Sequence, residues 1–404
     1  MNQKLTTKQK LTTNRKSKMN QKLIMTPGPT SIADNVLFAL GENSINPDLD
    51  KQFFIDYEKL LKKLANFLNT SSDVLILGGE GILGLEASCA SLIEPEDRVL
   101  CLSNGPFGKG FASFVSMYGG VPVLFESDFH KPLSVKEIES FLDEQGGFKA
   151  ATIIHCETPT GVLNPIEDIC PLLAERGIVT IVDAVSSIGA HDIDCDNWHI
   201  DMLLGASQKC FSAPAGLTFL TVSDRCWQIM DERTTPIASF YANLKLFKEW
   251  KAKQWFPYTM PSHLIHSFSV AVDNVMKEQD GQDEDRQDEE GRQYGQDNQY
   301  CVGVSDIFTR HSAVASYTRQ ALTSAGLKLY SEGGFSDSVT AFFLPSPLKS
   351  IDFLEYMKGE FNIFLGGGLG LGVGEEVIRI GHMGENCREE LVRHVLSAIE
   401  KALL

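Results

Sequence analysis

The sequence predicts an α/β protein whose larger part is a mostly parallel sheet covered by helices on both faces. Short apolar runs alternate with amphipathic stretches through residues 24–275, which is the order that parallel strands and crossover helices produce. The chain has 404 residues, 43% of them apolar and 22% charged, so it can form two or three ordinary globular domains. A glycine-rich turn follows the run at 74–77, as in many α/β proteins that bind ligands at strand ends.

The expected elements follow one another in regular order. Apolar runs predict strands at 74–77, 99–102, 121–125, 151–155, 179–182 and 202–204. Amphipathic stretches between them predict helices, including those at 83–93, 135–142 and 166–175. Beyond these we expect a helix at 305–325, short strands at 328–330, 339–344 and 377–380, and a final helix at 388–404. This last part of the chain therefore predicts a smaller α+β domain.

Two segments stand apart from this pattern and set the expected boundaries. Residues 1–23 form a basic arm, with seven Lys or Arg and no acid in 1–22, and the string MNQKL occurs twice in it. We interpret the arm as a duplicated start or a mobile arm rather than a targeting peptide, because it lacks an apolar helical face. Residues 278–299 hold nine acids against two bases and predict a disordered insertion. The expected large domain is therefore 24–275, and the small one 276–404.

Charge and cysteine usage argue against several classes of protein. The formal net charge of −17 has the wrong sign for a protein that binds nucleic acid over a broad surface. The nine cysteines are scattered without a Cys-x-x-Cys pair, which indicates neither a disulfide framework nor a zinc site. No apolar run approaches the roughly 18 residues that span a membrane. We expect a cytoplasmic protein that binds no metal, nucleic acid or membrane.

The glycine-rich turn at 79–84 fits the pattern G-x-G-x-x-G between a predicted strand and a predicted helix. A dinucleotide site would require an acid about twenty residues further on, at the end of the next strand. That strand ends in Cys101-Leu102-Ser103-Asn104, without an acid. A helix N-terminus that receives another polar group is therefore the favoured interpretation, and a purely structural turn is the alternative.

Asp183 and Lys209 are the candidates for chemistry. Asp183 ends one predicted strand and Lys209 follows the next through small residues, and the carboxyl ends of parallel strands are where α/β proteins bind ligands. A partly desolvated amine at such a position has a lowered pKa and becomes nucleophilic. The spacing alone also fits a buried ion pair, so both interpretations stay open at this point.

The strings around these two residues resemble those of class V pyridoxal-phosphate aminotransferases. Ala206-Ser207-Gln208-Lys209, with Ile200-Asp201 before it and Gly216-Leu217-Thr218 after it, matches the attachment pattern of that family. The resemblance covers 24–404 apart from the acidic insertion, and it includes the segments 27–29, 78–87, 104–108, 155–161, 183–187 and 379–384. Within the family the chain is most similar to the alanine–glyoxylate and serine–pyruvate group, with some features of pyridoxamine–pyruvate aminotransferase.

The resemblance implies a fold-type I enzyme with pyridoxal 5′-phosphate as its cofactor. Lys209 would form the Schiff base and later move a proton. Asp183 would pair with the pyridinium nitrogen, and Thr158 would bond the ring hydroxyl. Phe107 would stack on one face of the ring, although a plain core position is its alternative, and Val185 would pack on the other face.

The resemblance also implies a phosphate site and a substrate site. Gln208 and the backbone amides of Gly81 and Ile82 would hold the phosphate, with Thr259 reaching it from the neighbouring subunit of a homodimer. Gly28 would lie in the substrate site, where Arg379 would bind the substrate carboxylate through a two-bond fork.

The sequence departs from the family pattern within this cofactor site. Glu80 stands in the turn where Ser or Thr is usual, and Phe256 replaces a phosphate-binding Tyr. Pyridoxamine–pyruvate aminotransferase shares the Gly-Glu turn, but it has an arginine where this chain has Leu369. A carboxylate about 4 Å from a phosphate oxygen would cost about 4 kcal/mol per charge pair at an effective dielectric constant near 20.

The expected function is transfer of an amino group from alanine or serine to glyoxylate or pyruvate. The first alternative is transamination of the unphosphorylated vitamin pyridoxamine with pyruvate. A 2-aminoethylphosphonate–pyruvate aminotransferase is a weaker alternative. A non-catalytic binding protein is disfavoured because Lys209, Asp183 and Arg379 are all present.

Overall fold

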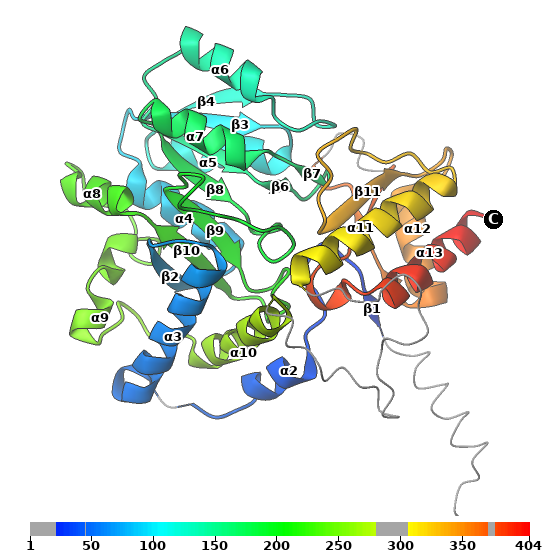
Figure 1. Ribbon diagram of the computed structural model, residues 1–404, viewed down its shortest axis with the longest axis horizontal. Helices are drawn as coiled ribbons and strands as arrows, with labels where there is room; N and C mark the ends of the chain where they lie inside the picture. Colours follow the sequence, from blue (N-terminus) through cyan, green and yellow to red (C-terminus); the bar gives the residue numbers. More distant parts are fainter. Residues whose placement is uncertain (1–21, 45, 280–305, 371–375) are drawn as a thin grey trace, which may run out of the picture.

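The larger body of the protein is built on a seven-stranded sheet (Figure 1). The structure is a computed structural model that describes residues 22–44, 46–279, 306–370 and 376–404. Its strands lie in the order β2-β10-β9-β8-β5-β3-β4, and β10 runs antiparallel to both neighbours while the other pairs are parallel. The strands are β2 (Asp73–Gly78), β3 (Arg98–Ser103), β4 (Val121–Glu126), β5 (Ala150–Ile154), β8 (Val179–Asp183), β9 (Met202–Ala206) and β10 (Leu217–Val222). The predicted α/β class with a mostly parallel sheet is confirmed.

Helices cover this sheet and bury its central strands completely. Every residue of β5, β8, β9 and β10 is buried, which explains why these strands are continuous apolar runs in the sequence. Helix α4 packs on β9 and β10, and α5 packs on β3 and β4. The helices of this body are α2 (Asp34–Leu40), α3 (Lys51–Phe67), α4 (Gly81–Leu92), α5 (Pro106–Met117), α6 (Val135–Glu144), α7 (Ile166–Glu175), α8 (Asp224–Glu232), α9 (Trp250–Lys253) and α10 (Ser262–Gln279). Among the described helices, none is long and apolar enough to cross a bilayer.

The smaller body is a three-stranded antiparallel sheet packed against three helices, drawn in yellow to red in Figure 1. Its strands are ordered β11-β14-β13, and its side chains form a second hydrophobic cluster that includes Phe342, Ile380 and Val392. The elements are α11 (Ile307–Ser324), β11 (Val339–Phe343), α12 (Ser350–Phe361), β13 (Gly366–Gly367), β14 (Val377–Gly381) and α13 (Glu389–Leu403).

The strand expected at 328–330 is wrong. Only a single bridge joins Leu329 to Phe342, because the chain leaves the small sheet directly afterwards. The Ser331 hydroxyl donates to the carbonyl of Thr160, and the Glu332 amide donates to the carbonyl of His130. The Tyr330 amide donates to the Ala341 carbonyl and the Lys328 carbonyl accepts from the Phe343 amide, but from residue 331 onward the chain bonds to the larger body, so the pairing ends after one bridge.

The first described residues of the chain lie with the smaller body. Strand β1 (Leu23–Ile24) pairs in parallel with β12 (Ile363–Phe364), and Met25 is fully buried in the second hydrophobic cluster. The expectation that the large domain starts at residue 24 therefore differs from this packing. We propose that the smaller domain takes residues 23–25 together with the C-terminal part of the chain. The basic arm up to residue 21 and the acidic insertion from residue 280 lie outside the described residues.

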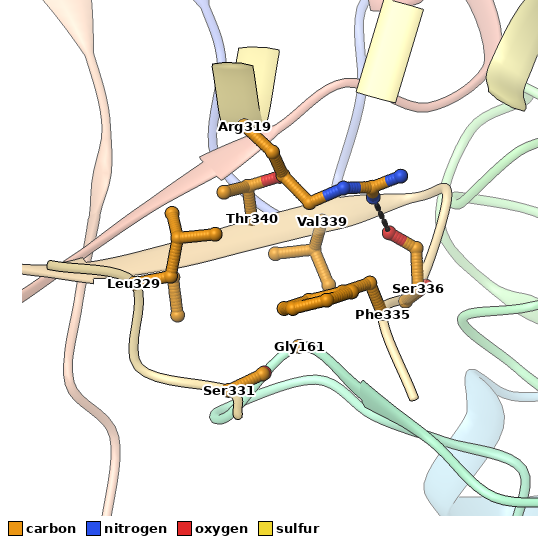
Figure 2. Close-up of a pocket in the computed structure, with 9 residues that line it drawn as sticks. Gly161, Arg319, Leu329, Ser331, Phe335, Ser336, Val339 and Thr340 are labelled. Carbon is orange, nitrogen blue, oxygen red and sulfur yellow. Dashed lines mark hydrogen bonds between the residues drawn. The ribbon is translucent and has the colours of Figure 1, made fainter. Parts of the chain in front are cut away.

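A short loop of the smaller body rests on the hairpin formed by β6 (Cys156–Glu157) and β7 (Val162–Leu163). Figure 2 shows the small cavity at this junction. Arg319 of α11 donates to the Ser336 carbonyl at 2.9 Å, and its guanidinium lies 5.3 Å from the centre of the Phe335 ring. The Ser336 amide in turn donates to the carbonyl of Gly161. The smaller body therefore supports the hairpin that carries Thr158.

Candidate active site

The two residues proposed for chemistry lie at the carboxyl ends of neighbouring strands. Asp183 is the last residue of β8, and Lys209 follows β9 by three residues. The Asp183 carboxylate accepts a 2.9 Å hydrogen bond from the Val185 amide, and the Lys209 amine donates to the Pro27 carbonyl at 2.5 Å. The fold thus places a buried acid and an amine at the edge where α/β sheets bind ligands.

Burial moves both groups toward their neutral forms. It lowers the pKa of Lys209, and the nearby charge of Asp183 opposes this shift. It raises the pKa of Asp183 to about 6, against the opposing effects of the Val185 amide and of Lys209. A lysine with a lowered pKa has a larger fraction of nucleophilic free amine at neutral pH.

Gly28 leaves room for the lysine. A Cβ at Gly28 would lie 2.5 Å from Lys209 Cδ and 2.9 Å from its Nζ, and the backbone φ of +85° also favours glycine. Gly81 is similarly close to Val185, where a Cβ would lie 3.1 Å from a Val185 methyl group. The N-terminus of α4 and the segment after Asp183 therefore meet.

Thr158 and Phe107 come to the same region from different elements. Thr158 is buried, and its hydroxyl lies 2.6 Å from the hydroxyl of Ser186. Phe107 is half-buried in the first turn of α5. Ser186 was not assigned a role from the sequence, although it stands in the segment 183–187. Its hydroxyl is a partner for Thr158 that only the fold reveals.

Arg379 of β14 is held in a fixed position. Its Nε donates to the Gly367 carbonyl at 2.7 Å, and one terminal nitrogen lies 3.4 Å from the Thr158 carbonyl. Burial lowers the pKa of Arg379 to about 10, so the side chain keeps its charge at neutral pH. The arginine has five N–H donors, and those that remain beyond these two bonds suit a carboxylate.

Two of the predicted phosphate donors, the Ile82 amide and the Gln208 side chain, are engaged by a carboxylate. Glu80 caps α4 by accepting from the Ile82 amide at 3.1 Å, and its other oxygen lies 3.4 Å from the Gln208 side-chain nitrogen. The Glu80 side chain is exposed, while the Gln208 carbonyl oxygen is buried and finds no donor among the described residues. An anion therefore already occupies the place where helix α4 attracts negative charge.

Three further residues of the expected cofactor site lie in the core or at the surface of this chain: Phe256, Thr259 and Leu369. Phe256 is a core residue, stacked on Phe54 with ring centres 5.0 Å apart, so its ring has no role at a phosphate. Thr259 is exposed, as a contribution to a second subunit requires. Leu369 is also exposed. Thr259 stays a prediction, because the structure contains one chain.

The donor and acceptor groups fit pyridoxal 5′-phosphate at its ring end. Lys209, Asp183 and Thr158 supply an amine, an acid and a hydroxyl, and Gly28 leaves room for the lysine side chain. At the phosphate end the N-terminus of α4 and Gln208 have the right chemistry, provided that the exposed Glu80 side chain turns away. Within the described ranges, no cluster of three His, Cys, Asp or Glu side chains suits a metal ion.

Comparisons with known proteins agree with this fold. Residues 36–254 match the family model for class V aminotransferases. An uncharacterised aminotransferase of Methanocaldococcus jannaschii is 31% identical over 388 residues, which are 95% of this chain and 93% of the relative. Pyridoxamine–pyruvate transaminase of Mesorhizobium japonicum is 28% identical over 384 residues, covering 94% and 91%. The crystal structure of alanine–glyoxylate aminotransferase from Nostoc sp. has a TM-score of 0.85 at 25% identity and covers 95% of each chain.

The chain belongs to the class V aminotransferases. It is a pyridoxal-phosphate-dependent transaminase of fold type I, as the strings around Asp183 and Lys209 predict.

Proposed function

We propose that this enzyme transfers an amino group from alanine or serine to glyoxylate or pyruvate. The observation that carries the proposal is the placement of Arg379, a buried cation fixed by two carbonyls, whose charge also acts on Lys209. One guanidinium beside the reactive amine suits a small substrate with one carboxylate. The Nostoc relative is named for alanine and glyoxylate and the Mesorhizobium relative for pyruvate, which supports the same substrate class.

The proposed roles of the residues are supported by their positions. The cofactor, when bound, supplies an electron sink for the electron pair left on the substrate Cα. Lys209 is proposed to hold the cofactor covalently and to carry the proton to and from Cα. Asp183 would hold the ring nitrogen through its charge, and Phe107 would cover one face of the ring. Arg379 orients donor and acceptor through the group that all 2-amino and 2-oxo acids share.

A homodimer is the proposed assembly. Leu37, Phe38, Ile82 and Trp255 are all more than two-fifths exposed, and exposed apolar side chains of this size mark interaction surfaces when they gather. Ile82 lies at the predicted phosphate end and Trp255 stands four residues before Thr259 in the sequence, so we propose that the second subunit completes the site. The cytoplasm is the proposed location, because seven described cysteines are buried thiols outside any disulfide: Cys89, Cys101, Cys156, Cys170, Cys195, Cys210 and Cys226.

The second candidate is transamination of unphosphorylated pyridoxamine with pyruvate, and the position of Glu80 favours it. Its carboxylate lies on the Ile82 amide and near Gln208, where a phosphate would otherwise bind. In this version Glu80 would accept a hydrogen bond from the hydroxymethyl group of the vitamin.

Replacing Glu80 with serine separates the two candidates. With the vitamin as substrate, Glu80→Ser should slow pyridoxamine turnover and tighten pyridoxal-phosphate binding by up to about 10³-fold, as removal of a repulsion of about 4 kcal/mol allows. With permanently bound cofactor, affinity should rise only slightly. The measurement is pyridoxal and alanine formation by phosphate-free apoprotein supplied with pyridoxamine and pyruvate. Glu144→Ser, at an exposed carboxylate of α6, is the control.

Absence of pyridoxal in that assay, together with alanine–glyoxylate activity that requires added pyridoxal phosphate, would eliminate the vitamin as substrate.

A further inference from the structure

The N-terminus of helix α5 is capped by a carboxylate from a different part of the fold. Its N-cap residue, Gly105, has no side chain to accept the free amides of the first turn. Instead Glu157 of β6 accepts from the Phe107 amide at 2.9 Å through one oxygen and from the Gly108 amide at 3.0 Å through the other. The first-turn amides that every helix leaves unpaired are thus satisfied across about fifty residues of sequence.

The site is built to hold this carboxylate. Glu157 is fully buried, and a Cβ at Gly105 would lie 2.2 Å from Glu157 Cγ, so only glycine leaves the room it needs. The carbonyl of Glu157 accepts from the amides of Thr160 and Gly161, which fixes the backbone of the turn. Burial raises the pKa of Glu157 to about 7, while the two amides favour its charged form.

Both ends of this contact lead to the proposed cofactor site. One Glu157 oxygen accepts from the amide of Phe107, whose ring is proposed to cover the cofactor. The residue after Glu157 is Thr158, which bonds Ser186 through its hydroxyl and lies near Arg379 through its carbonyl. A shift of the Glu157 carboxylate would therefore change the distance between the Phe107 ring and Thr158.

We propose that Glu157 is a positioning residue for transamination, which fixes the ring of Phe107 relative to Thr158 through its two hydrogen bonds to the start of α5. The inference rests on the proposed function, because it assumes that Phe107 covers the cofactor. A glutamine at 157 has one acceptor oxygen and an NH₂ group, so it satisfies only one of the two amides. The geometry requires a carboxylate.

The test compares purified, cofactor-loaded Glu157→Gln, Phe107→Leu and the double variant with the wild type. Glu157→Gln should lower kcat about 10- to 100-fold with KM for the amino donor within about threefold, as expected for a small misplacement in the site. It should also change the visible circular dichroism of the bound cofactor and weaken cofactor affinity. The double variant should be no slower than the slower single variant, because both changes act through one ring.

Glu126→Gln is the matched control. Glu126 contacts the same helix through its ion pair with Lys109, but on the surface, so its variant should match the wild type in all these measurements. If Glu157→Gln does not fold, Gly105→Ala serves instead, since its Cβ displaces the Glu157 side chain without removing the carboxylate.

Two outcomes separate this inference from the proposed function. If Glu157→Gln lowers only the melting temperature, while kcat and circular dichroism stay normal and Phe107→Leu alters both, Glu157 is a structural cap and the inference is wrong. If Phe107→Leu changes neither, the placement of Phe107 over the cofactor is wrong, and the inference falls with it.

Discussion

Lys209→Ala should fold, bind the cofactor only noncovalently and lose transaminase turnover by several orders of magnitude. The reason is that one substitution removes both the group that holds the cofactor and the proposed proton carrier. The Lys209 side chain is half-buried, its amine bonds to the Pro27 carbonyl, and burial lowers its pKa. Steady-state turnover, and mass spectrometry of the borohydride-treated protein, are the measurements.

The wild type should gain the mass of one reduced cofactor after borohydride treatment, and the variant should gain none. Lys59→Ala, at a lysine whose side chain is 62% exposed, should behave as the wild type. Near-normal turnover of Lys209→Ala would mean that the reactive amine has been assigned to the wrong residue.

Arg379→Ala should lower kcat/KM for both the amino donor and the 2-oxo acid by about 2 to 4 kcal/mol, or about 30- to 1000-fold. The loss should affect both substrates alike because each has the carboxylate that the guanidinium binds. Arg379→Lys keeps the charge but loses the planar fork, so it should recover only part of the activity. The measurement is kcat/KM for alanine, serine, glyoxylate and pyruvate.

Arg393→Lys, at a half-exposed arginine paired with Glu389 on α13, is the control for a general effect of the substitution. Unchanged kcat/KM for all four substrates in Arg379→Ala would show that the substrate carboxylate binds elsewhere.

The sequence was sufficient to predict that Asp183 and Lys209 lie together at the carboxyl ends of neighbouring strands. Asp183 and Lys209 each follow a continuous apolar run, and the order of parallel strands brings such ends to one edge. The class of fold follows from the same runs. These predictions needed no knowledge of contacts between distant side chains.

The contacts between distant residues could not be predicted. Glu157 meets the amides of Phe107 and Gly108 only because the hairpin and α5 pack together, and no local pattern marks that pairing. Ser186 meets Thr158 for the same reason. The short segment at 328–330 bonds to β11 through Lys328 and Tyr330, but the next residues, Ser331 and Glu332, bond to the larger body, so tertiary contacts end the strand pairing there.

The position of Glu80 also required the structure. The sequence places the Glu80 carboxylate in the turn before α4, but it does not say whether this side chain points toward the phosphate position or away from it. The bonds to the Ile82 amide and toward Gln208 are the observation that gives the vitamin-substrate candidate its support.

The hydrogen bond between the Lys209 amine and the Pro27 carbonyl makes the reactive amine sensitive to changes near β1. Pro27 lies two residues beyond Met25, whose side chain is anchored in the smaller body and whose carbonyl accepts from the Gly381 amide. Shortening the chain past residue 25, or fusing a rigid partner directly before β1, would therefore disturb the resting position of the reactive amine.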